Sequence, residues 1–288
     1  MVRVIAGLVL ACISFIAHAL SPYVQADKLA GGDLKTVMSA VEQKLSGAGF
    51  QVIGRHVPKG IAGYASVVVT DAGILDAVRQ IGGTAIVAAP IRVGVKADGA
   101  VSYMNPEYWY RAYLRGDYTK AEAAVRALAG KLEKALGKAG VFGGDVKTED
   151  LSEYRYMFGM ERFHNRAEIK EYKSFEEAVR VVRTNLDKGV AHSAKVYELV
   201  LSDQKLAVFG FAMNDPETGE AWWVRKTGPD HVAALPWEVF VVGGKVMALH
   251  ARYRTALSWP ALTMGTFMGI GKHPDYVLQM AEDIAGVQ

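Results

Sequence analysis

The sequence predicts an α+β protein made of two tandem, diverged α/β units, each an antiparallel sheet with helices packed on one face. Three observations predict this class. Amphipathic helices and short apolar strands alternate along the chain, Gly-containing turns join neighbouring strands, and the same series of elements occurs twice. The chain has 288 residues, of which 51% are hydrophobic, so it is long enough to bury two cores.

Residues 1–26 have the pattern of a secretory signal peptide. Arg3 is followed by an apolar run from Val4 to Leu20, and Pro22 then ends any helix. We expect cleavage near Ala26, with a second possible site after Ala19, and location in the periplasm or outside the cell. A retained membrane anchor is the alternative, for which this run is at the lower limit of length.

Composition excludes several kinds of chemistry once the signal is removed. Cys12 is the only cysteine, so the mature protein is cysteine-free. Thiol catalysis, disulfide exchange, cysteine-ligated zinc, iron–sulfur clusters and c-type haem are therefore excluded. A lipoprotein cut before Cys12 is disfavoured, because the apolar run continues past it. Loss of Arg3 from the 33 basic residues leaves a balance of +2 against the 30 acidic ones, which offers no footprint for nucleic acid.

The first unit, residues 27–141, begins with Asp33 as a helix N-cap before an apolar stripe at helical spacing. Asp98-Gly99 predicts a hairpin turn between two later strands. A long helix rich in Ala, Leu, Lys and Glu closes the unit. The expected elements are a helix at about 33–47, strands from 50 and at 65–69, a short helix at 71–81, hairpin strands at 85–96 and 100–104, and a helix at about 119–138.

We expect residues 142–172 to be a linker and residues 173–288 to be the second unit with C-terminal helices. Adding 141 to Asp33 gives Ser174, and the apolar stripe recurs after it; the Pro-led strand and its Gly turn recur at an offset of 146. The copies are expected to differ at residues 222–225, which have a strand pattern where the first unit has its short helix. The other expected elements are a helix at 174–187, strands at 194–201 and 205–213, a hairpin turning at 243–244, a helix capped by Ser258 and a helix from about 275 to 285.

Several loose motifs resemble a small bacterial family called domain of unknown function 302. They are a helix ending in Gly49-Phe50, the strand Val67-Val68-Val69 with its short helix, and Pro90-x-x-Val93 leading to Asn105-Pro106. The resemblance covers about residues 33–115, with a fainter second copy at about 174–255. It implies an α+β fold with helices on an antiparallel sheet, and it implies no reaction. The family tends to have a cysteine where this chain has Ile91 and Trp237, which removes a thiol role.

One candidate ligand site places an imidazole between two guanidinium groups. His250, Arg252 and Arg254 alternate, so on a continuing strand they would share a face suited to a carboxylate, phosphate or sulfur oxyanion. A solvated strand face with ordinary salt bridges is the alternative. The other residues expected to line this ligand site are Glu238, His231, Trp237, Tyr253 and Trp109.

A second candidate site contains thioether and imidazole groups. Met157, Met160 and His164 lie at i, i+3 and i+7, and Met264 and Met268 precede His273. Such groups bind copper(I), and His/Met pairs bind haem iron. Methionine stripes at helical spacing also occur as ordinary core packing. No cofactor is predicted, and copper or haem at this site is the alternative.

Together these features predict an exported protein that binds a small amphipathic or anionic ligand in a cleft between the two units. The first alternative is a metal-handling or redox accessory protein that uses His and Met. The second is an enzyme with His250 or His231 as general acid or base. No motif names a reaction, and the ligand and the oligomeric state are not encoded in any pattern that we find.

Overall fold

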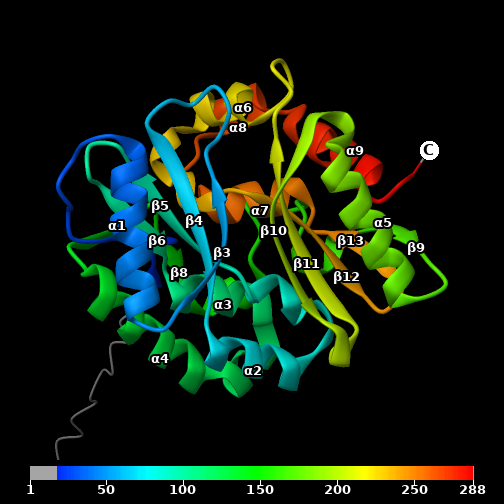
Figure 1. Ribbon diagram of the computed structural model, residues 1–288, viewed down its shortest axis with the longest axis horizontal. Coiled ribbons are helices and arrows are strands. Elements are labelled where there is room, and N and C mark those ends of the chain that lie inside the picture. Colours follow the sequence, from blue (N-terminus) through cyan, green and yellow to red (C-terminus); the bar gives the residue numbers. More distant parts are fainter. Residues whose placement is uncertain (1–17, 288) are drawn as a thin grey trace, which may run out of the picture.

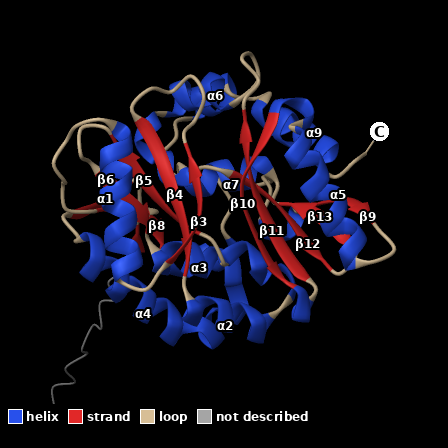
Figure 2. Ribbon diagram, viewed as in Figure 1, coloured by secondary structure: helices blue, strands red, loops and turns tan. Residues whose placement is uncertain are grey.

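The computed structural model describes residues 18–287 and is organised around two antiparallel sheets (Figures 1 and 2). The first sheet has six strands in the order β3-β4-β5-β6-β2-β7, and the second has five in the order β10-β11-β12-β13-β9. Strands β1 and β8 form a separate pair. The α+β class predicted from the sequence is confirmed.

The first half begins with two short strands, and two more short strands follow its long helix, α4. Asp33 caps α1 as expected, because its side chain accepts a hydrogen bond from the Thr36 N–H. The strand expected at 85–96 is shorter, because residues 83–88 form a 3₁₀ helix, η1. The elements are β1 (Ala19–Leu20), β2 (Tyr23–Gln25), α1 (Leu34–Gly47), β3 (Gln51–His56), β4 (Tyr64–Thr70), α2 (Ala72–Ile81), β5 (Ile91–Lys96), β6 (Val101–Met104), α3 (Pro106–Leu114), α4 (Tyr118–Leu136), β7 (Gly140–Phe142) and β8 (Val146–Lys147).

The second half corrects three expectations. Residues 222–225 belong to a helix, α6, whose buried residues Glu220, Trp223 and Val224 have helical i, i+3, i+4 spacing. Ser258 ends a helix instead of capping one. Strand β9 lies inside the expected linker and belongs to the second sheet. The elements are β9 (Ala167–Glu171), α5 (Phe175–Lys188), β10 (Ser193–Leu201), β11 (Leu206–Met213), α6 (Glu220–Thr227), β12 (Trp237–Val242), β13 (Lys245–Ala248), α7 (Ala251–Ser258), α8 (Met264–Gly269) and α9 (His273–Ile284).

The two sheets have the same order when strands are matched by their place in each half. Strands β3, β4, β5, β6 and β2 correspond in turn to β10, β11, β12, β13 and β9. The first strand of each series also carries a bulge, between Val52 and Gly54 in β3 and between Lys195 and Tyr197 in β10. Helix α6 occupies the place of α2, so the expected difference between the copies at this point is wrong. The internal repeat stays a prediction, which these matches support.

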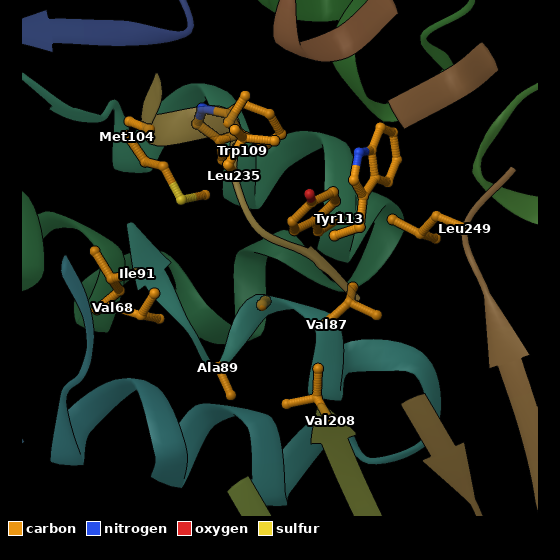
Figure 3. Packing of buried hydrophobic residues seen from close by; sticks show 14 of the residues in the cluster. Val68, Val87, Ala89, Ile91, Met104, Trp109, Tyr113, Val208, Leu235 and Leu249 are labelled. Atoms are coloured by element: carbon orange, nitrogen blue, oxygen red, sulfur yellow. The ribbon is translucent and has the colours of Figure 1, made fainter. Parts of the chain in front are cut away.

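The two halves share one buried core. Strands β3 and β10 lie side by side at the centre of the molecule (Figure 1), where a Cβ on Gly54 would come within 2.6 Å of the Val196 carbonyl oxygen. Each half also sends a 3₁₀ helix onto the other sheet, with η1 packing on β11 and β12 and η7 (Pro229–Ala234) packing on β4 and β5. Figure 3 shows side chains of both halves meeting in this core, among them Ile91, Trp109 and Leu235.

The position of strand β2 in the first sheet distinguishes between the two predicted cleavage sites of the signal peptide. It lies between β6 and β7, Tyr23 is fully buried, and the Trp109 indole N–H donates to the Pro22 carbonyl at 2.7 Å. Cleavage after Ala26 would therefore remove an inner strand of the first sheet, whereas cleavage after Ala19 would keep it. Most of the predicted signal, residues 1–17, lies outside the described residues. None of the described helices is long and apolar enough to cross a membrane.

Candidate functional site

A pocket of about 440 Å³ opens beside the C-terminal helices, and we call it the methionine pocket. Its walls come from the segment before β9 and from α7, α8 and the start of α9. Most of the lining atoms are apolar, and no acidic residue lines it within residues 18–287. The lining residues are Met157, Met160, Arg252, Thr255, Met264, Phe267, Met268, Ile270, Gly271, His273 and Pro274.

Local interactions hold the two sides of this pocket together. The Thr263 hydroxyl accepts a hydrogen bond from the Thr266 N–H and so caps α8. The ring of Tyr156 stacks on Phe267 at 4.9 Å between centroids, and its hydroxyl donates to the Leu262 carbonyl. These contacts place the segment around residues 156–160 against α8 and bring its methionines to those of α8.

His273 forms a buried part of the pocket wall. Its side chain is 1% exposed, and its ring stacks on Trp223 at 4.3 Å between centroids. Neither ring nitrogen has a hydrogen-bond partner in the part of the chain that the structure describes. Burial lowers the pKa of His273 to about 3, so the imidazole is neutral at physiological pH. A neutral, unpartnered imidazole can donate one hydrogen bond and offers one lone pair.

Arg252 lines the methionine pocket, and its positive charge is paired with a carboxylate. Its Nη1 lies 3.1 Å from Oε1 of Glu161, and the same oxygen lies 3.5 Å from Nε2 of His250. Burial lowers the pKa of His250, while Glu161 opposes this shift and Arg252 adds to it. His250 and Arg252 also line a neighbouring cavity of about 190 Å³. These three groups form a nearly neutral cluster, because one carboxylate faces one guanidinium and a mostly uncharged imidazole.

The shared face expected for His250, Arg252 and Arg254 does not form, because these residues begin a helix. His250 is the N-cap of α7, and its Nδ1 accepts the Arg252 N–H at 3.3 Å. Residues two apart on a helix point about 200° apart, so the two arginines face opposite ways. Arg252 points to the surface pair with Glu161, whereas Arg254 is 1% exposed and points into the contact between the halves.

Three buried charges meet in that contact, and we call Arg92, Glu238 and Arg254 the central charge cluster. The Arg92 guanidinium forms an ion pair with Glu238, and Arg254 Nε lies 3.6 Å from the other carboxylate oxygen. Both guanidiniums also lie over the Trp109 ring, at 5.3 and 5.0 Å. Burial lowers the pKa of Arg92, but the Glu238 carboxylate, together with Tyr113 and Tyr197, offsets this and holds the pKa above its usual range.

The remaining predicted ligand residues lie around this cluster, where Trp237 and Tyr253 are buried and His231 is partly buried. Trp237 lies 5.4 Å from the Arg254 guanidinium, and the Tyr253 hydroxyl donates to the Ala112 carbonyl. His231 stacks on Trp259, and its Nδ1 lies 2.9 Å from the Ser258 carbonyl oxygen; burial lowers its pKa. These side chains pack into the contact between the halves and line neither of the two cavities described above, so the ligand cleft expected there stays a prediction.

The fold brings together a different group of methionine and histidine side chains from the one predicted from the sequence. Met157 and Met160 line the methionine pocket together with Met264, Met268 and His273, whereas His164 is exposed and does not line it. Among the described residues, no three His, Cys, Asp or Glu side chains form a metal-binding group. A metal in this pocket would therefore depend on thioethers.

Sequence reasoning missed several residues of both sites. Arg92 is the most important, and one pattern could have found it: the offset of 146 that relates the Pro-led strands pairs Arg92 with Glu238. Opposite charges at matching positions of two copies can meet near a two-fold axis. Phe267, Thr255 and Ile270 carried no comparable pattern, because their role depends on how α7, α8 and α9 pack.

Comparisons with protein-family models, with curated proteins and with solved structures give no match for this chain. The resemblance to the domain of unknown function 302 family therefore stays a prediction.

Proposed function

We propose that the chain is an exported binding protein that holds a small amphipathic molecule in the methionine pocket. A volume of about 440 Å³ is within the range of about 300–1,000 Å³ that is usual for small-molecule sites. Unbranched thioether side chains adapt to ligands of irregular shape. The ligand site is thus moved from the expected cleft between the units to the surface of the second half.

The observation that carries this proposal is the buried imidazole in an apolar wall. A buried polar group without a partner costs about 1–3 kcal/mol, so a ligand group that bonds to His273 would recover that free energy. Arg252 can add a contact to a polar or anionic group at the pocket, in competition with Glu161. These features favour a molecule that is mostly apolar and carries one or two polar groups.

We further propose that export involves cleavage after Ala19. The charged residue, apolar run and small residue before the cut are those of a signal peptide. The buried position of Tyr23 in β2 favours this site over the one after Ala26.

The binding proposal is tested by titrating the full mature chain with the amphipathic fluorescent probe N-phenyl-1-naphthylamine. Met264→Trp places a bulky ring at the pocket, and Val141→Trp places the same ring at an exposed position on β7. We expect saturable binding that Met264→Trp weakens by about tenfold or more, a loss of ~1.4 kcal/mol, and that Val141→Trp leaves unchanged. No saturable binding, or equal loss in both variants, would overturn the proposal.

The natural ligand is sought by native mass spectrometry of protein purified from its own cell envelope. We expect a retained mass of a small organic molecule that the Met264→Trp variant lacks. A retained molecule that is equally present in the variant would place the binding site elsewhere.

A further inference from the structure

Two methionine pairs that are distant in the sequence meet in one pocket. Met157 and Met160 precede β9, whereas Met264 and Met268 belong to α8, yet all four line the methionine pocket. They are four of the ten methionines in the chain. The fold thus concentrates thioether sulfur at a single place.

Core packing does not explain this group. Met268 is 73% exposed, Met157 47% and Met264 39%, whereas methionines that fill a core are buried. Exposed methionine side chains are accessible to a solute that enters the pocket.

The same pocket contains a nitrogen donor beside the methionines. His273 lines the pocket wall, and both of its ring nitrogens lack a hydrogen-bond partner among residues 18–287. An imidazole nitrogen that no other group occupies is a common metal ligand.

We propose that the methionine pocket binds one copper(I) ion through its thioethers and His273. Thioether and imidazole donors select soft ions, and copper(I) is the soft ion best matched to them. The absence of an acidic residue from the described lining disfavours divalent ions, because a single positive charge is less costly than two in an apolar site. Haem is disfavoured because its two propionates would meet one lining cation, Arg252, which Glu161 already neutralises.

This inference rests on the same pocket as the proposed function but on different atoms. An amphipathic molecule uses the apolar surface of the methionines, whereas copper(I) uses their sulfur atoms. Leucine keeps an apolar side chain of similar volume and removes the sulfur, so Met→Leu variants separate the two.

The test is an anaerobic titration of the full mature chain with copper(I), kept reduced by ascorbate and competed by the chelator bicinchoninate. The pocket variants are Met157→Leu/Met160→Leu and Met264→Leu/Met268→Leu. The matched control is Met247→Leu/Met280→Leu, which changes two buried methionines that do not line the pocket. His164→Ala is a second control, because His164 is exposed and outside the pocket.

We expect one equivalent of copper(I) in the wild type and in both controls. Each pocket variant should bind at least about tenfold more weakly, because even the loss of an outer-shell partner typically lowers metal affinity 10–100-fold. The naphthylamine probe should bind both pocket variants as it binds the wild type, since their apolar surface is preserved.

Two results would overturn the copper inference. One is a wild type that does not retain copper(I) against bicinchoninate, and the other is unchanged affinity in both pocket variants. If the probe still binds in either case, the proposed function stands and only the copper site is rejected. If the probe does not bind the wild type while copper(I) does, the proposed function is rejected and the copper site stands.

Discussion

Replacing Glu238 by Gln should destabilise the protein more than any surface charge change, because it leaves two buried guanidiniums without a counter-charge. The side chains of Arg92 and Arg254 are 0% and 1% exposed, and that of Glu238 is 8% exposed. Solvent therefore screens these charges little, and the substitution preserves the shape of the side chain. Cation–π contacts with Trp109 remain but do not replace a carboxylate.

The expected loss is about 3–5 kcal/mol in the free energy of unfolding, the usual cost of removing one partner from a buried ion pair. This is a large part of the ~5–15 kcal/mol that stabilises a typical domain. The assay is urea unfolding followed by tryptophan fluorescence, with the free energy obtained from the midpoint and slope. The variant should unfold at a clearly lower urea concentration.

The matched control is Glu168→Gln, which breaks an exposed pair with Lys245. That pair has an N–O distance of 3.1 Å, and its side chains are 55% and 43% exposed. Exposed pairs contribute about 0–1 kcal/mol, so this variant should unfold almost as the wild type does. A free energy of unfolding for Glu238→Gln that lies within about 1 kcal/mol of the value for Glu168→Gln would refute the view that the three buried charges depend on one another.

Two further predictions concern His273 and the N-terminus. Because the folded pKa of His273 is about 3 and the unfolded value is about 6.5, the unfolded state binds more protons between these values. Wild-type stability should therefore fall by up to about 1.4 kcal/mol per pH unit below pH 6.5 relative to His273→Phe; parallel curves in pH-dependent urea unfolding would contradict this. Intact-mass analysis of the exported protein should give Leu20 as the first residue, and a chain beginning at Asp27 would contradict cleavage after Ala19.

The sequence by itself determined the local structure wherever one periodic pattern was unambiguous. The N-cap and apolar stripe after Asp33 predicted α1, and the same signature after Ser174 predicted α5. The turn at Asp98-Gly99 predicted the β5–β6 hairpin. In such segments the capping side chain and the buried face are close in sequence, so local physics fixes the element.

Short segments with mixed patterns depended on tertiary packing. The apolar residues 222–224 fit a strand or a helix, and only their burial against the rest of the second half selected the helix α6. Residues 250–254 fit a continuing strand equally well, and the helix that they begin separated Arg252 from Arg254. A pattern of four or five residues cannot distinguish the helical period of about 3.6 residues from the strand period of two. Contacts with distant segments therefore determine which element forms.

The candidate sites followed the same division between local and distant information. Residue chemistry already indicated that methionine and histidine could bind a soft ligand, and the chain contains them in two pairs with a later His273. Only the packing of α7, α8 and α9 against residues 156–160 joined these pairs and excluded His164. Likewise, Arg92 and Glu238 are 146 residues apart, and their ion pair forms because the two halves bury their sheets against each other. Proximity between distant residues is a property of the whole fold, because it depends on how every intervening element packs.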